Sequence, residues 1–306
     1  MHPAISVIFF TVTSGAGFGF IALIGLGLPM PEGGMAAFIA AAIGGGLSVA
    51  GLVSSTFHLG HPERAWRAFS QWRSSWLSRE GVCAVITLTL FGVYTLLWVF
   101  WSTRIPWLGY GISVGAVATV FTTSMIYAQL KTVPLWNNHL TPICYLLFAA
   151  TSGLLLVAMF GYWTTSGNNT VGLTLVTVLA LSWGTKIAWW RAANGENSLA
   201  RRGSDTGTAT GLGNIGTVRL LEKPHSGENY LTKEMVFQIG RKHAYKLKII
   251  ALVLGALVPV MLTAIVSLTN LPAVLLSMAF LALLAGLFVE RWLFFAEARH
   301  AVSLYY

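Results

Sequence analysis

The sequence predicts an all-α integral membrane protein with eight transmembrane helices and both termini in the cytoplasm. Hydrophobic residues make up 55% of the 306 residues and charged residues only 9%, which leaves too little polar surface for a soluble domain of this size. The mean hydropathy of +0.69 agrees with this. The basic residues gather at one end of the predicted helices, and this asymmetry gives the predicted orientation.

Apolar runs of about 20 residues define the predicted helices, because that length crosses a hydrocarbon core of roughly 30 Å. No repeat and no alternating pattern typical of a barrel accompanies them. We therefore expect one transmembrane domain over residues 1–306, with a long cytoplasmic loop at 191–246 that contacts a partner subunit. The eight runs lie at about 4–28, 35–57, 81–101, 108–128, 141–163, 170–190, 247–268 and 271–294.

Lysine and arginine residues are distributed very unequally between the two sides. The termini, the loops after the even-numbered runs and the adjoining helix ends hold eighteen of them, and only Arg104 lies on the other side. The positive-inside rule then places the termini and these loops in the cytoplasm. The net charge of +9 thus indicates orientation and contact with anionic lipid or acidic partners rather than nucleic acid. Two widely separated cysteines indicate neither a disulfide framework nor a zinc site.

Titratable groups follow the same asymmetry. All seven histidines map to the basic face, which excludes two haems stacked across the bilayer but leaves open a single haem held, for instance, by His58 and His243. No predicted span carries an acid at mid-depth, which argues against a proton pump or ion-coupled transporter. Three charged residues lie about one turn from the basic ends of their helices: Lys186, Glu290 and Arg291. Glu290 and Arg291 are interpreted either as a structural ion pair or as the wall of a polar cavity.

The polar stretch at residues 58–80 is the candidate functional loop. His58 ends the second predicted span and Glu80 begins the third, so an imidazole and a carboxylate lie at the same membrane surface. A quinone headgroup needs hydrogen-bond donors, two protons on reduction and an apolar cleft for its tail. Histidine exchanges protons near neutral pH, although at a helix end it is often structural. The loop therefore indicates a quinone site, with a structural role for the histidine as the alternative.

Several motifs in order resemble those of the DmsC-type membrane anchor subunits in the dimethyl sulfoxide reductase family of molybdenum enzymes. Residues 58–65 (HLGHPERA) resemble the signature HLGxPxRA of these anchors. The further matches are residues 75–80 (SWLSRE) to SxLSxE, Tyr127 with residues 133–136 (VPLW) to a Tyr and VPxW element, and Thr141-Pro142 to the TP that opens the fifth span.

The resemblance implies a complex of three subunits. A catalytic subunit would carry a molybdenum bis-pterin guanine dinucleotide cofactor, and a ferredoxin-like subunit would carry four [4Fe–4S] clusters. This chain would anchor both and exchange electrons with ubiquinone or menaquinone without a haem of its own. The motif positions imply that His58 and Glu80 are catalytic at the quinone site, and that Arg64, Tyr127 and Trp136 line its pocket. An arginine after a helix equally binds lipid phosphate, and interfacial Trp or Tyr is often an anchor.

The long loop departs from the dimethyl sulfoxide reductase anchors. Its segment 208–222 has no equivalent there and instead resembles the anchors of cytoplasmic sulfite dehydrogenases. Residues 211–216 (GLGNIG) formally fit GxGxxG, but no βαβ unit is predicted around them, so a dinucleotide site is not indicated. The loop is either an arm over the iron–sulfur subunit or a flexible linker.

Together these features predict the anchor of a cytoplasmic sulfite:quinone oxidoreductase in the bacterial inner membrane, with a role in sulfur or anaerobic metabolism. In the predicted reaction sulfite becomes sulfate, and its electrons pass through the clusters to quinone near His58. The alternatives are the anchor of a quinol-oxidising dimethyl sulfoxide or polysulfide reductase, a transporter, and a purely structural anchor.

Overall fold

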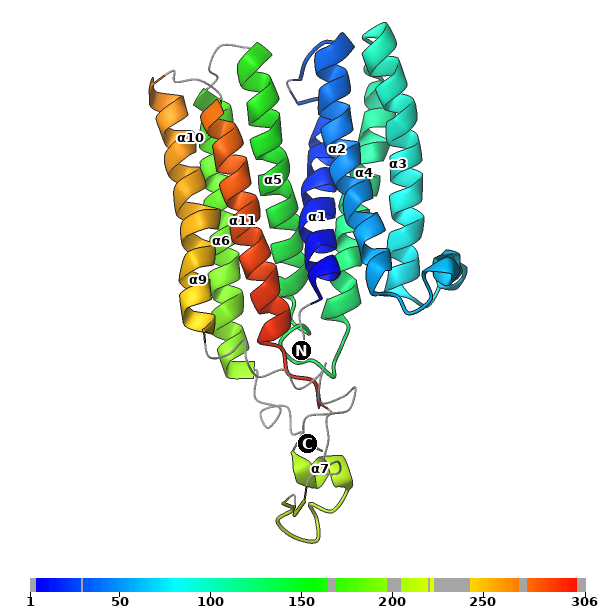
Figure 1. Ribbon diagram of the computed structural model, residues 1–306, viewed down its shortest axis with the longest axis vertical. Helices are drawn as coiled ribbons and strands as arrows, with labels where there is room; N and C mark the ends of the chain where they lie inside the picture. Colours follow the sequence, from blue (N-terminus) through cyan, green and yellow to red (C-terminus); the bar gives the residue numbers. More distant parts are fainter. Residues whose placement is uncertain are drawn as a thin grey trace.

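The structure, a computed structural model, describes residues 4–28, 30–164, 169–196, 205–219, 221–222, 243–269 and 274–301. Within these ranges eight helices are long and apolar enough to cross a membrane, which confirms the predicted class. They stand side by side in one bundle (Figure 1). The N-terminal end of α1 and the C-terminal end of α11 lie at the same end of this bundle. The side of the membrane on which this end lies stays a prediction.

The observed helices match the predicted spans closely. The spanning helices are α1 (Ile5–Gly25), α2 (Gly34–Ser54), α3 (Trp76–Trp101), α4 (Pro106–Ala128), α5 (Leu140–Thr164), α6 (Asn169–Glu196), the continuous run of α9 (Ala244–Leu252), η5 (Val253–Leu257) and α10 (Val258–Thr269), and α11 (Val274–Ala296). Shorter elements are η1 (Ser55–His58), η2 (Pro62–Gln71) and α7 (Thr206–Thr210).

One helix begins earlier than the apolar pattern predicts. The apolar run starts near residue 81, whereas α3 starts at Trp76. Ser75 is the cause, because its side chain accepts a hydrogen bond from the backbone N–H of Ser78 and so caps the helix. As a result Glu80 lies inside the first turns of α3, on a rigid element, rather than in the loop before it.

α1 is the central helix of the bundle. In its most apolar window 78% of the residues are buried, against 28% for α3, and it packs against α2, α4 and α5. Glycines permit this close approach, because a Cβ on Gly19 would collide with the backbone of Ala149 in α5, and one on Gly25 would collide with Gly109 in α4. Small residues at helix contacts are a usual way to bring helices together in lipid.

Arg104, the one basic residue predicted on the opposite side, has a structural role there. It lies between α3 and α4, and its guanidinium donates to the carbonyl of Leu28 just beyond the C-terminal end of α1 (3.1 Å) and contacts the hydroxyl of Tyr94 (3.3 Å). Carbonyl groups at a helix C-terminus lack partners within the helix and favour a nearby cation. Arg104 therefore ties the start of α4 to the C-terminal end of α1.

The seventh span contains a π-helical turn, η5, with an identifiable cause. Pro259 has no N–H to donate to the carbonyl of Gly255, four residues earlier. The indole N–H of Trp183 in α6 donates to that carbonyl instead, at 2.7 Å. The freed acceptor therefore ties α6 to the seventh span.

The contact between α1 and α5 generates a prediction about stability. Gly19→Ala places a methyl group against the α5 backbone, and overpacking of this kind costs about 1–3 kcal/mol. Gly15→Ala on the same helix is the matched control, because a Cβ there meets nothing within 4 Å. We expect thermal unfolding in detergent to begin at a lower temperature for Gly19→Ala and to be nearly unchanged for Gly15→Ala; equal midpoints would contradict the packing.

Candidate functional site

Glu80 is a buried carboxylate near the N-terminal end of α3. Its side chain is 3% exposed, and one of its oxygens accepts a hydrogen bond from the hydroxyl of Thr123 in α4. Within the described parts of the chain Glu80 forms no ion pair. Burying a carboxylate in an apolar surrounding is costly. A buried acid held by a neutral donor is the type of group that exchanges protons in functional sites.

Tyr127 lies one turn after Thr123 on the same face of α4, and its ring is at the centre of an aromatic cluster. It is 8% exposed, and Thr123, which holds the Glu80 carboxylate, precedes it by four residues on α4. The carboxylate and the cluster therefore lie along the same face of α4. The rings around Tyr127 are Trp136 (5.4 Å between centroids), Phe295 (5.5 Å), Phe294 (5.6 Å) and Tyr145 (6.1 Å, stacked).

Trp136 fixes the loop between α4 and α5 under the cluster. It is 3% exposed, and its indole N–H donates to the carbonyl of Phe294 in α11 (2.8 Å). Thr141 donates to the carbonyl of Trp136 (2.9 Å) and accepts from the indole of Trp189 in α6 (3.0 Å). Trp136 therefore joins three helices inside the protein, and its burial excludes the role of an anchor at the lipid surface.

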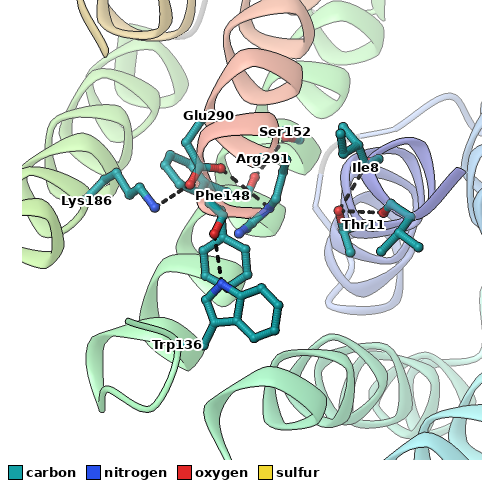
Figure 2. A network of polar contacts seen from close by, with 10 residues as sticks. Ile8, Thr11, Trp136, Phe148, Ser152, Lys186, Glu290 and Arg291 are labelled. Carbon is teal, nitrogen blue, oxygen red and sulfur yellow. Dashed lines mark hydrogen bonds and ion pairs between the residues drawn. The ribbon is translucent and has the colours of Figure 1, made fainter. Parts of the chain in front are cut away.

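A buried network of charges lies beside this cluster (Figure 2). Lys186 of α6 and Glu290 of α11 form an ion pair with side chains 1% and 0% exposed, and the Nε atom of Arg291 lies 3.5 Å from the second carboxylate oxygen. Two cations share this one carboxylate, and aromatic rings stabilise the remaining positive charge. Lys186 Nζ lies 3.6 Å from the ring centre of Trp189, and Arg291 Cζ lies 3.7 Å from that of Tyr145.

A small cavity between α1, α5 and α11 adjoins Arg291, and its mixed lining includes the polar side chains of Thr11, Tyr145 and Ser152. The hydroxyls of Thr11 and Ser152 donate to backbone carbonyls of their own helices and so present lone pairs to the cavity. The hydroxyl of Tyr145 has no hydrogen-bond partner in the described part of the structure. With about one water's volume, the cavity offers both donors and acceptors. Arg291 thus belongs both to an ion network and to a cavity wall, so both sequence interpretations apply.

The predicted site residues do not all meet. Glu80, Tyr127 and Trp136 lie in one region, whereas Arg64 lies on the exposed η2, with its Nε 3.8 Å from Glu63. The backbone of His58 ends η1, but its side chain lies outside the described residues.

Sequence reasoning did not find Thr123 and Tyr145. The only available signal was spacing, since Thr123 precedes Tyr127 by four residues. In the ranges given above, no group of three His, Cys, Asp or Glu side chains is arranged to hold a metal ion.

Comparison with known proteins identifies the family. Residues 1–296 match the family described as "DMSO reductase anchor subunit (DmsC)". The chain belongs to this DmsC family. It is 33% identical over 338 aligned positions to the C subunit of the sulfite dehydrogenase of Allochromatium vinosum, covering 100% of this chain and 99% of that protein. It is also 29% identical over 137 positions to the anaerobic dimethyl sulfoxide reductase protein YnfH of Escherichia coli, covering 43% of this chain and 47% of that one.

As a DmsC-family protein, the chain is a multi-pass membrane anchor of an oxidoreductase built from several subunits, which confirms the resemblance in the motifs. Its long loop is described at residues 205–219 and 221–222, which form the short helix α7 and the turns after it. Asp205 caps α7 and accepts from the backbone N–H of Thr208 (2.7 Å), which lowers the pKa of its carboxyl. Contact between this loop and a partner subunit stays a prediction.

The charge network predicts how the anchor responds to loss of one partner. Glu290→Gln leaves Lys186 buried without a counter-ion, which costs on the order of 3 kcal/mol. Combining it with Lys186→Met removes both charges and should restore part of the loss in thermal unfolding. Glu297→Gln is the control, since its pair with Lys248 has side chains 14% and 19% exposed and either group reaches water. A double variant less stable than Glu290→Gln would refute the pairing.

Proposed function

We propose that this chain is the quinone-reactive anchor of a cytoplasmic sulfite:quinone oxidoreductase. Its partners would be a molybdenum catalytic subunit and a ferredoxin-like subunit with four [4Fe–4S] clusters. Similarity over the full length to the C subunit of a sulfite dehydrogenase supports the substrate. The gathering of eighteen of the nineteen Lys and Arg residues on one side supports a bacterial inner-membrane location with the docking face in the cytoplasm.

The observation that carries the quinone assignment is the buried Glu80 carboxylate beside Tyr127. A quinone headgroup requires hydrogen-bond donors at its two oxygens, a source of protons and flat apolar walls. Tyr127 supplies a phenolic donor and Glu80 an exchangeable proton, while Trp136 and its neighbouring rings supply the walls. These residues fit the group chemically. His58, which the motif couples to Glu80, follows α2 at the same end of the bundle.

Bound quinone supplies the two-electron acceptor and takes up two protons for each sulfite oxidised. Thr123 holds the Glu80 carboxyl in a fixed orientation, so that its proton is transferred from a defined position. Tyr127 would hold the headgroup through a hydrogen bond from its hydroxyl. The rings packed around it exclude bulk water, which strengthens each hydrogen bond in the site. Glu80 is then reloaded from the nearby water boundary.

A second function uses the same site in reverse. The similarity to the anaerobic dimethyl sulfoxide reductase protein YnfH favours a quinol-oxidising anchor, in which Glu80 would accept the proton instead of donating it. The two functions differ only in the catalytic subunit that the anchor holds. Isolation of the complex and identification of the substrate that its molybdenum subunit turns over decides between them.

The proposal predicts separate effects on two activities. Glu80→Gln and His58→Ala should each slow sulfite-dependent quinone reduction by at least about tenfold, as expected for loss of an acid–base group. Sulfite-to-dye activity, which bypasses this chain, should remain. Glu80→Gln should also flatten the dependence of the rate on pH.

Thr123→Val tests the orientation of Glu80 and has a matched control in Thr122→Val. The Thr123 hydroxyl contacts Glu80, whereas that of Thr122 bonds only to backbone carbonyls of its own helix. Thr123→Val should therefore slow quinone reduction severalfold and Thr122→Val should not. Equal loss of quinone and dye activities in the Glu80 variant would show that Glu80 is structural.

The same geometry predicts that turnover is electroneutral. Electrons and protons reach quinone from one side, since Glu80 and the charge network lie at the same end of the bundle. Proteoliposomes that contain the complete complex should build up no membrane potential during sulfite:quinone turnover, as followed with a voltage-sensitive dye. An uncoupler-sensitive potential would overturn the proposed arrangement.

A further inference from the structure

The segment between α2 and α3 carries an exposed surface that the quinone site does not use. Residues 59–75, here called the arm, include η2, in which no residue is buried. Figure 1 shows that the arm projects sideways beyond α2 and α3, at the level of the helix ends. The elements that extend below the bundle, such as α7, lie elsewhere in the same view. The arm therefore points along the expected membrane surface rather than away from it.

The arm exposes large aromatic side chains. Trp66 is 66% exposed, Trp72 53% and Phe69 43%. In water, exposure of three such rings within seven residues is unfavourable, whereas at a membrane interface tryptophan is well accommodated. Its ring enters the apolar layer while its N–H meets the headgroups.

Arginines alternate with these rings. The guanidinium of Arg67 lies 5.6 Å from the ring centre of Trp66, and that of Arg73 lies 5.4 Å from the ring centre of Trp72. Arg64 brings the number of arginines on the arm to three, and Glu63 is its single acidic residue. The arm therefore carries a net positive charge. Guanidinium groups bind phosphate oxygens in pairs and lose little hydration when they stack on a ring.

The arm is held in place by α3. The hydroxyl of Ser78 donates to the carbonyl of Ala68, and Arg79 donates to the carbonyls of Trp72 (3.0 Å) and Arg73 (2.7 Å). These bonds fix the arm at the middle and at the C-terminal end of its aromatic stretch. Its rings and arginines are therefore presented in one orientation, which lowers the entropic cost of binding a partner.

We propose that the arm lies in the cytoplasmic headgroup layer and binds anionic phospholipid. Trp66, Phe69 and Trp72 enter the acyl boundary, while the arginines bind lipid phosphate. Its sideways position, net positive charge and exposed rings favour lipid over a protein partner. The inference assigns Arg64 to lipid and is independent of the substrate proposed above.

The test measures the depth of the arm in the complete complex. Ser70→Cys carries a nitroxide spin label, at an exposed position whose hydroxyl bonds only to the carbonyl of Arg67. Arg219→Cys, in the long loop after α7, serves as the reference. The complex without an added cysteine gives the background. Collisions with oxygen and with a water-soluble nickel chelate are measured in nanodiscs with increasing fractions of phosphatidylglycerol. We expect the label at residue 70 to gain oxygen contact and lose nickel contact as this fraction rises, while the reference does not change.

Charge variants test the role of the arginines. Arg67→Gln and Arg73→Gln should each lower the equilibrium constant for insertion about fivefold at a fixed phosphatidylglycerol fraction, because one cation near an anionic surface contributes about 1 kcal/mol. Arg219→Gln, an exposed arginine outside the arm, should have no effect. The proposal would be overturned if the label at residue 70 stayed accessible to the nickel chelate in every lipid mixture. It would also be overturned if a partner subunit shielded the label from both reagents. A transition that is independent of lipid charge and unchanged in the arginine variants would contradict it too.

Discussion

The buried ion network of Lys186, Glu290 and Arg291 is the constraint on which the candidate site depends. An unpaired charge at this depth costs several kcal/mol, so α6 and α11 can pack only where Lys186 meets Glu290. Phe294 lies one turn beyond Glu290 on α11 and packs against Trp136 and Tyr127. The height at which the charges meet therefore also sets the height of the aromatic wall. A shift of one turn in α11 would separate the ion pair and dismantle the wall together.

The site lies where the first four spans meet the later ones. Glu80 and Thr123 come from α3 and α4, whereas Tyr145 and Phe294 come from α5 and α11. α1 packs against α4 and α5 and so holds the two groups at a fixed separation, which its glycines make short. The positions of the site residues thus depend on α1, which contributes no side chain to the site. A substitution that disturbs the packing of α1 would therefore displace Tyr127.

Much of the fold was accessible from the sequence, because lipid imposes a length and an apolarity that each span must satisfy. The early start of α3 was not, since residues 76–80 are too polar for a hydropathy argument and the cap at Ser75 alone reveals the helix. Within the candidate site, Glu80, Tyr127 and Trp136 were predicted from motif resemblance, and the structure places them in one region. Thr123 escaped notice because a threonine in a transmembrane helix usually bonds to its own backbone, and only the fold brings it to Glu80. The pairing of Lys186 with Glu290, far apart in the chain, has no periodic signal either.

Two kinds of tryptophan illustrate why burial decides what the ring does in a membrane protein. Trp136 and Trp183 each donate an indole hydrogen bond to a backbone carbonyl of another helix, so they replace partners that lipid cannot provide. Trp66 and Trp72 face outward beside arginines, with the polar edge of each ring available to solvent or headgroups. The buried indoles donate their N–H to a carbonyl, Trp136 near the end of the bundle and Trp183 in the middle of α6, whereas the exposed indoles offer theirs to water or headgroups. The difference is that the buried pair fixes helices to one another, whereas the exposed pair is placed to fix the whole bundle at a defined depth.

On this arrangement, the depth at which the arm meets the headgroups also sets the distance of the Glu80 carboxyl from the water that reloads it, because both are carried on the first turns of α3.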